Sequence, residues 1–128
     1  MFKKYFLLIG LGLILVVLWT STCFKFPTQE NKAPNKPVIT GDTTGFAPDT
    51  IDVSIIALDP DNDQVAYRLD LGSGSQEELP WSAYYPSGEP FMISLIIGSP
   101  GIYSIKAMAK DVNEDSSDWS EIRHIIMQ

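Results

Sequence analysis

Hydrophobic and polar residues alternate along much of the chain after residue 50. A period of two places hydrophobic side chains on one face of a β-strand, so this pattern predicts half-buried strands. Four runs follow it, and their inward positions span 51–57, 65–71, 91–97 and 103–109. A fifth run, 122–127, alternates less regularly. In the run 91–97, Met92 and Ile96 make the outer face hydrophobic as well.

Clusters of glycine, proline, serine and aspartate separate these runs, and such residues favour tight turns. Examples are Asp59-Pro60-Asp61-Asn62-Asp63 and Gly98-Ser99-Pro100-Gly101. Short strands divided by turns at this spacing are typical of an antiparallel β-sandwich. We therefore expect residues 38–128 to form one all-β domain, an immunoglobulin-like antiparallel β-sandwich of about seven strands.

The start of the chain has a different pattern, an unbroken hydrophobic run from Tyr5 to Trp19 that follows two lysines. This order is typical of an export signal or a membrane anchor, so we expect residues 1–26 to form a hydrophobic helix. As a helix, Phe6 to Phe24 would rise about 28 Å, close to the thickness of a bilayer core. Alternatively, Cys23 stands where a lipoprotein signal places its lipidated cysteine. Either anchor predicts a domain at the cell membrane that faces outside the cytoplasm.

The segment 27–37 contains three prolines and few hydrophobic residues. This composition predicts an extended linker between the anchor and the domain. From Asn31 to the end there are 6 lysines and arginines and 15 acidic residues, which gives a net charge of 6 − 15 = −9. Because phosphate binding needs a basic surface, this charge argues against a nucleic-acid partner. The single cysteine excludes an internal disulfide, so the hydrophobic core must stabilise the domain.

Several motifs appear in the order found in one family. They are Ala33-Pro34-Asn35-Lys36-Pro37, Ala57-Leu58-Asp59-Pro60-Asp61, Gly101-Ile102-Tyr103-Ser104-Ile105 and Ser117-Asp118-Trp119-Ser120. With these motifs the chain resembles a PKD-type immunoglobulin-like domain of bacterial and archaeal surface proteins. The resemblance implies a seven-stranded sandwich that binds or spaces, and it does not imply catalysis. It also implies that Trp119 lies over the core.

Acidic residues concentrate in two of the expected turns. In an immunoglobulin-like sandwich these turns share one end, which would bring Asp59, Asp61 and Asp63 close to Asp111. Carboxylates gathered at one place repel each other unless they are solvated, protonated or bridged by a hard cation. Two interpretations stay open. Either the aspartates bind calcium as a cofactor, or they are turn residues that bond only to the local backbone and the protein has no cofactor.

Aromatic residues mark a second candidate site. Trp81, Tyr84 and Tyr85 precede the run 91–97, and exposed rings at a sandwich edge could stack on a surface glycan or anchor a protein partner. Packing against the core is the alternative. Tyr85 is expected to be the most exposed, because it breaks the alternation with Tyr84. His124 is the only histidine and has no nucleophile motif beside it, so we expect a binding or spacer module and not an enzyme.

Overall fold

The computed structural model describes residues 27–72 and 78–128. The predicted anchor, residues 1–26 with Cys23, lies outside the described residues, so its helix stays a prediction. A compact unit runs from Asn31 to Gln128 and contains the whole of the hydrophobic core. The described ranges contain strands and no helix, and hence no helix suited to crossing a membrane.

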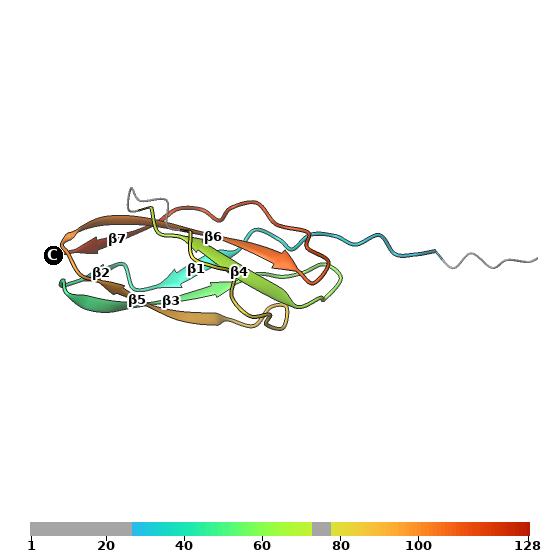
Figure 1. Ribbon diagram of the computed structural model, residues 1–128, viewed down its shortest axis with the longest axis horizontal. Coiled ribbons are helices and arrows are strands. Elements are labelled where there is room, and N and C mark those ends of the chain that lie inside the picture. The colour runs from blue at the N-terminus through green and yellow to red at the C-terminus, as the bar shows by residue number, and fades with distance from the viewer. Residues whose placement is uncertain (1–26, 73–77) are drawn as a thin grey trace, which may run out of the picture. The chain divides into compact units, whose positions relative to one another are not determined.

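Seven strands form two sheets that pack face to face, which confirms the predicted all-β sandwich (Figure 1). The smaller sheet has the order β1-β3-β5 and the larger has the order β2-β7-β6-β4. All pairings are antiparallel except that of β2 with β7, which is parallel and only two residues long. The strands are β1 (Val38–Gly41), β2 (Thr44–Gly45), β3 (Asp49–Ile56), β4 (Val65–Asp70), β5 (Phe91–Ile97), β6 (Gly101–Asp111) and β7 (Arg123–Met127).

The core consists mainly of the alternate residues that the sequence pattern selected, and it also contains Ile39 of β1. On β3, Ile51, Val53 and Ile55 are buried, while the residues between them face outward or are half-buried. Tyr67 links the two sheets, because its hydroxyl oxygen accepts a hydrogen bond from the N–H of Ala57, 2.9 Å away. The Tyr67 ring also stacks on Phe91, with ring centres 5.7 Å apart. Burial raises the pKa of the Tyr67 hydroxyl, which therefore stays neutral in this interior.

The second half of the predicted linker belongs to the compact unit. Pro34 and Pro37 are buried, and the N–H of Asn35 donates to the carbonyl oxygen of Leu58 at 2.8 Å. Lys36 forms an exposed ion pair with Glu121, 2.7 Å apart. This segment therefore packs on the sandwich from Asn31 onward, and residues 27–30 are the described part that lies outside the unit.

Three serines attach irregular segments to the edges of the larger sheet. Ser82 donates its N–H to the Tyr67 carbonyl, and its hydroxyl oxygen accepts from the Tyr67 N–H. Ser117 and Ser120 repeat this exchange with Ala109 and Ala107 of β6. In each case a side chain supplies the acceptor that a regular neighbouring strand would supply from its backbone. The segments 78–85 and 116–120 thus extend the sheet without being regular strands.

This arrangement explains why the expectation for Trp119 was wrong. Ser117 and Ser120 turn inward to reach the backbone of β6, and both are buried. Trp119 lies between them outside the core cluster, and the Lys106 ammonium sits 4.7 Å from the centre of its ring. Because side chains next to an inward residue point to the opposite face of an extended segment, the tryptophan covers the outer face of the sheet instead.

Candidate functional site

The two acidic turns meet at one end of the sandwich, as predicted (Figure 1). One follows β3 and the other follows β6. The Asn113 side-chain amide of the second turn donates to the Asp63 carboxylate of the first, 3.2 Å away. Asn31 also reaches this place from the N-terminal segment, and its side-chain oxygen Oδ1 accepts a hydrogen bond from the Asn113 side-chain amide at 2.8 Å. Three segments that are distant in the sequence therefore converge here.

In the first turn, Asp59 organises the backbone. One carboxylate oxygen, Oδ1, accepts the N–H groups of Asp61 and Asp63 at 2.9 and 3.1 Å. Its carbonyl oxygen accepts from the N–H of Asn62, which adopts a left-handed backbone with φ of 62°. The Asp59 side chain is buried, and its Oδ2 has no hydrogen-bond partner among the described residues. A buried carboxylate oxygen without a donor is costly, and it is a feature that a cation or a water could satisfy.

In the second turn, Asp111 plays the same part. Its Oδ1 accepts the N–H groups of Asn113 and Asp115 at 2.8 and 3.0 Å. Glu114 occupies the left-handed position, with φ of 69°. Unlike Asp59, Asp111 has a partner for its Oδ2, because the Asn31 amide nitrogen donates to it at 2.7 Å and to Asp115 at 2.6 Å. The amide nitrogen thus lies between two carboxylates, where it reduces their repulsion.

In this arrangement the four predicted calcium ligands serve chiefly as turn residues. They are Asp59, Asp61, Asp63 and Asp111. Asp61 accepts the N–H of Lys32, Asp63 accepts the Asn113 amide, and the remaining two hold their own turns. Within the described ranges, no group of three or more acidic, histidine or cysteine side chains is placed to hold a metal ion. The unpartnered oxygen of Asp59 is the one feature here that favours a cation, so calcium binding stays a prediction.

The three aromatic residues of the predicted site, Trp81, Tyr84 and Tyr85, lie in different environments. Tyr85 packs partly buried against the core, 4.9 Å from the Phe91 ring, so the expectation that it is the most exposed was wrong. Tyr84 is the more exposed tyrosine, at 37%. The physical reason is that Tyr85 exchanges backbone hydrogen bonds with Val65 of β4, which turns its ring inward under β5. Trp81 is half-buried on the outer face of the larger sheet.

Cations cover the Trp81 ring. The Arg68 guanidinium carbon and the Lys110 ammonium lie 5.5 and 5.0 Å from its centre. Each cation also pairs with an acid, Arg68 with Glu78 at 2.7 Å and Lys110 with Glu114 at 2.6 Å. The hydrogen bond to Glu114 raises the pKa of Lys110, and Lys110 together with Tyr84 lowers the pKa of Glu114. The Trp81 ring and both cations thus make their contacts within the domain.

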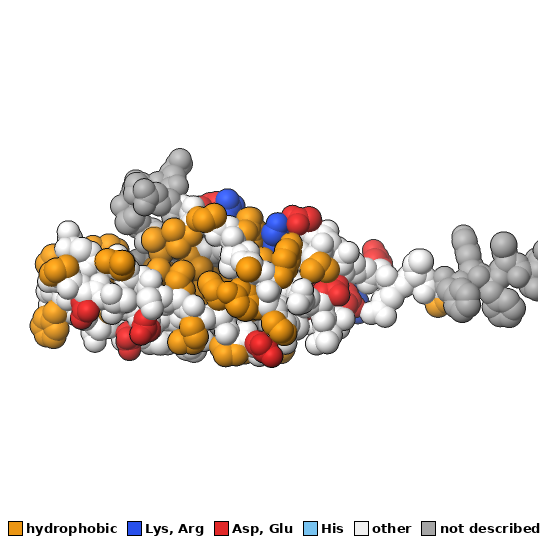
Figure 2. All heavy atoms as spheres, turned by 60° about the horizontal axis from the view of Figure 1, so that its bottom comes forward, with side chains coloured by type: hydrophobic (Ala, Val, Ile, Leu, Met, Phe, Trp, Pro, Cys, Tyr) orange, Lys and Arg blue, Asp and Glu red, His pale blue; other side chains and the backbone are white. Residues whose placement is uncertain are grey.

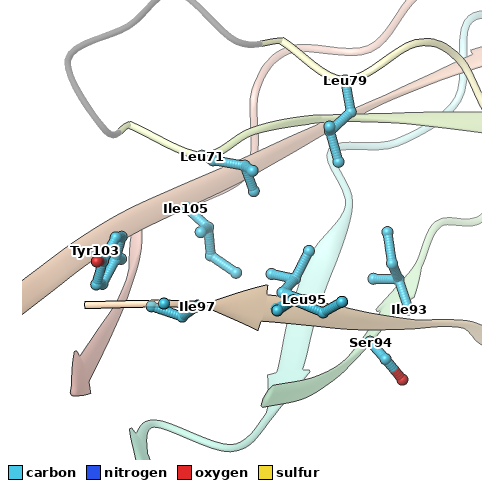
Figure 3. Close-up of a pocket in the computed structure, with 10 residues that line it drawn as sticks. Leu71, Leu79, Ile93, Ser94, Leu95, Ile97, Tyr103 and Ile105 are labelled. Atoms are coloured by element: carbon cyan, nitrogen blue, oxygen red, sulfur yellow. The ribbon is translucent and has the colours of Figure 1, made fainter. Parts of the chain in front are cut away.

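A hydrophobic groove opens where the free edge of β5 faces the larger sheet. We call it the β5 groove. It encloses about 440 Å³, and a smaller hollow that shares Leu79 and Ile93 continues it toward Trp81. Figure 3 shows Ile93 and Leu95 pointing into it, whereas Ser94 points away. It is lined by Leu71, Leu79, Ile93, Ser94, Leu95, Ile96, Ile97, Gly98, Tyr103 and Ile105.

Figure 2 shows hydrophobic side chains gathered across the middle of the face that carries β5, with acidic side chains toward its margins. Beside the groove, Met92 and Ile96 on the outer face of β5 are 63% and 86% exposed. The sequence signalled these two residues through the hydrophobic outer positions of the run 91–97. It did not reveal the groove itself, because a groove requires both sheets to be in place.

Comparison with known proteins supports this architecture. Neither a protein-family model nor a curated protein matches the sequence. Among solved structures, the PKD domain of an M14-like peptidase from a Thermoplasmatales archaeon matches with 31% identity and a TM-score of 0.70, covering 77% of this chain and 98% of that domain. A CARDB domain from Pyrococcus furiosus, solved in complex with di-metal ions, matches with 9% identity and a TM-score of 0.55, covering 81% and 97% of the two chains.

Proposed function

Because the chain belongs to the family of PKD domains, we propose that it is a membrane-tethered, outward-facing immunoglobulin-like module that binds a protein partner. The observation that carries this proposal is the β5 groove beside a free strand edge. An extended polypeptide can add a strand to such an edge and place alternate side chains in the hollow beside it. The described residues that line the groove include none with a charge, so the matching segment of the partner is hydrophobic.

The tether is proposed from the sequence of residues 1–26, and the family is consistent with it, since PKD-type domains occur in surface and secreted proteins. The compact unit begins at Asn31, which leaves only a few residues between the proposed anchor and the domain. A linker this short, about 3.1 Å per extended residue, holds the domain close to the surface of the bilayer. A binding role at the membrane surface suits this placement better than a role as a long spacer.

Glycan binding is the alternative, and the aromatic residues give it less support. Stacking on sugar needs flat, open rings, and two of them in one plane make a platform. Tyr85 is turned toward Phe91, and two cations occupy the neighbourhood of the Trp81 ring. Tyr84 is exposed, but its hydroxyl contacts the Asp111 carbonyl and the Glu114 carboxylate. A hydrophobic groove therefore offers a better binding surface than these rings do.

Photocrosslinking in the native membrane tests the binding site. A benzophenone amino acid at Ile96, next to the groove, should form adducts with a polypeptide partner. The same amino acid at Ile102, which is 71% exposed on the outer face of β6, is the matched control. Equal yields at both positions, or no adduct at Ile96, would contradict a binding role for the β5 groove.

Thiol labelling in intact cells tests the orientation. Gln64 is exposed in the turn after β3, so Gln64→Cys should react with a membrane-impermeant maleimide if the domain faces outward. The unchanged chain, whose only thiol is Cys23, is the control. Labelling that requires permeabilised cells would contradict the proposed localisation.

We also propose a calcium ion at the acidic end of the sandwich, as a stabilising cofactor. The buried Oδ2 of Asp59 favours it, because an unpartnered carboxylate oxygen is a hard ligand. The relative from Pyrococcus furiosus was solved with di-metal ions, and at 9% identity it speaks for the fold alone. A calcium ion here would stabilise the convergence of the two turns and would take no part in chemistry.

A further inference from the structure

The two sheets have four edges, and three of them are short or covered. β1 has four residues and β2 has two. The outer edge of β4 is covered by the segment 78–85, in which Leu79 and Ser82 donate N–H groups to carbonyls of β4 at 2.8 Å. β5 differs from all three. It has seven residues, and among the described residues it pairs only with β3.

The sequence of β5 contains none of the features that keep strand edges from pairing. Natural edge strands are guarded by charged residues, prolines, bulges or short length. Phe91–Ile97 contains no charged residue, no proline and no glycine, and it pairs with β3 in an unbroken register of seven residues. In a domain with a net charge of −9, this strand is a neutral, hydrophobic strip with an open backbone edge.

We propose that the partner of this edge is a second copy of the same chain, which pairs β5 antiparallel with β5. The inference deepens the proposed binding role of the β5 groove and rests on it. A two-fold axis through Ser94 pairs all seven residues, because Ser94 is the middle of the strand. It sets Ser94 against Ser94 of the second copy and sets Met92 against its Ile96. The two small sheets then become one continuous sheet with the order β1-β3-β5-β5-β3-β1.

The same axis also covers the groove. It stands perpendicular to the sheet, so the inner faces of both copies stay on the same side. Ile93 and Leu95 point inward from β5, as Figure 3 shows. In the dimer, the corresponding residues of the second copy extend the hydrophobic lining across the open side of each groove. One interface thus pairs the backbone edge and buries the hydrophobic surface, which is what an isologous contact requires.

The negative charge of the domain does not oppose this pairing. The nearest acidic side chain on the outer face is Asp52 of β3, which pairs with Ser94. Across the axis, two Asp52 residues would be three strand spacings apart, about 14 Å at ~4.8 Å per spacing. This separation exceeds the Debye length of about 8 Å at physiological salt, so the repulsion is largely screened. A strongly charged partner would gain nothing from the described lining of the groove, which includes no charged residue.

Cysteine crosslinking of the full chain in its membrane tests the register. In a Cys23→Ser background, Ser94→Cys places two thiols directly opposite, with β-carbons about 5 Å apart. Oxidation or a short bismaleimide should link most of the chain into dimers. Met92→Cys alone should not crosslink, because two copies of it lie four residues apart along the strand. Mixing Met92→Cys with Ile96→Cys should restore the crosslink, and strong crosslinking of Met92→Cys alone would overturn the proposed register.

A charge introduced at the edge tests the interface without disturbing the core. Ile96→Lys changes an 86% exposed side chain and should weaken dimerisation about tenfold or more, because the symmetric interface receives two lysines. Ile102→Lys makes the same change at a 71% exposed site and should leave the dimer unchanged. The readout is the mass by light scattering of the purified full chain, with a thermal melt to verify that each variant folds. A monomeric unchanged chain at micromolar concentration would overturn the inference.

Photocrosslinking at Ile96 and the oligomeric state together distinguish failure of the β5 pairing from failure of the β5 groove as a binding site. Photocrosslinks from Ile96 to a different protein, together with a monomeric chain, would overturn the second copy as partner and keep the groove as a binding site. If Ile96 forms adducts neither with a different protein nor with a second copy of the chain, both the binding role of the β5 groove and the β5 pairing are contradicted. Dimers that persist in Ile96→Lys, together with no crosslink in Ser94→Cys, would show association through another surface and would overturn the β5 pairing.

Discussion

The turns after β3 and after β6 are built in the same way around Oδ1 of an aspartate, and they differ at its Oδ2. Each starts with a buried aspartate whose Oδ1 accepts the N–H groups two and four residues later. Each has a left-handed residue at the fourth position, Asn62 in one and Glu114 in the other. The difference lies at Oδ2, which accepts from Asn31 in Asp111 and has no partner among the described residues in Asp59.

This difference distinguishes the hydrogen bonds that form within a turn from the hydrogen bond that a distant segment supplies. The hydrogen bonds to Oδ1 are local, so each turn can form them from its own five residues. The bond from Asn31 spans 80 positions in the sequence, and it holds the N-terminal segment against the end of the sandwich.

Asp111→Ala should cause the largest loss. It leaves two backbone N–H groups and the Asn31 amide without their acceptor, so we expect it to lower the unfolding free energy by about 3 kcal/mol. Asp59→Ala should cost less, about 2 kcal/mol, because its Oδ2 accepts no bond that can be lost. Chemical denaturation of residues 31–128 measures both, with Asp118→Ala, at an exposed aspartate, as the control. Equal losses at the two aspartates would remove the distinction between the turns.

Asn31→Ala should have the next largest effect. Its amide bonds to two carboxylates, and hydrogen bonds to charged groups contribute about 1.5–3 kcal/mol. The effect should be smaller in an Asp111→Ala background, where the bonds of Asn31 to Asp115 and Asn113 remain, and should add fully to that of Asp59→Ala, since Asn31 contacts Asp111 and not Asp59. A double-mutant cycle measured by denaturation distinguishes these cases. Coupling of Asn31 to Asp59 as strong as its coupling to Asp111 would contradict the structure.

Calcium should have a smaller effect that acts through the first turn. At affinities of about 10⁻⁴–10⁻³ M, millimolar calcium would add on the order of 1 kcal/mol and raise the melting temperature by a few degrees. Potassium chloride at matched ionic strength should do less, because screening is not coordination. Asp61→Asn with Asp63→Asn should abolish the difference between the salts. If both salts shift the melt equally, the aspartates serve only as turn residues.

Acid should have the smallest effect on stability, and this effect should distinguish the two left-handed residues, Glu114 and Asn62. The pKa of Glu114 is lowered by its hydrogen bonds from Lys110 and Tyr84, whereas Asn62 does not titrate. A carboxyl whose pKa is lower in the folded state adds stability above its unfolded pKa of about 4.3, and this stability is lost as the pH falls through the folded value. Glu114→Gln should therefore flatten the acid limb of the stability profile below about pH 5. Asn62→Gln should leave the slope of that limb unchanged, and the same slope in Glu114→Gln as in the unchanged chain would contradict the prediction.

The aromatic residues show where sequence reasoning succeeded and where it failed. The outward positions of Met92 and Ile96 were predicted correctly from alternation, because a strand with a regular register obeys a period of two. Tyr84, Tyr85 and Trp119 lie on segments that attach to a sheet through single bridges or serine side chains. Alternation does not hold at Tyr84 and Tyr85, so the exposure predicted for Tyr85 was wrong. The core position that the family resemblance implied for Trp119 was wrong because Ser117 and Ser120 take the inward positions there.

The meeting of the two acidic turns at one end of the sandwich was predictable, whereas the contact that Asn31 makes with them was not. That two acidic turns share one end follows from the order of strands in an immunoglobulin-like sandwich, and Asn113 does reach Asp63. The part played by Asn31 was not predictable, since the segment that contains it has the composition of a linker. Its contact depends on Pro34 and Pro37 being buried against the sandwich, which no local pattern indicates.

The fold class, the inward face of each long strand and the two self-organised turns follow from local patterns, because each pattern involves residues at most a few positions apart. Which aspartate oxygen has a partner, which strand edge stays open among the described residues and where a hydrophobic groove forms depend on tertiary packing. Those features arise when segments 29 to 80 residues apart in the sequence pack together. Side chains of the same chemical type then differ in role, because packing gives each one different neighbours.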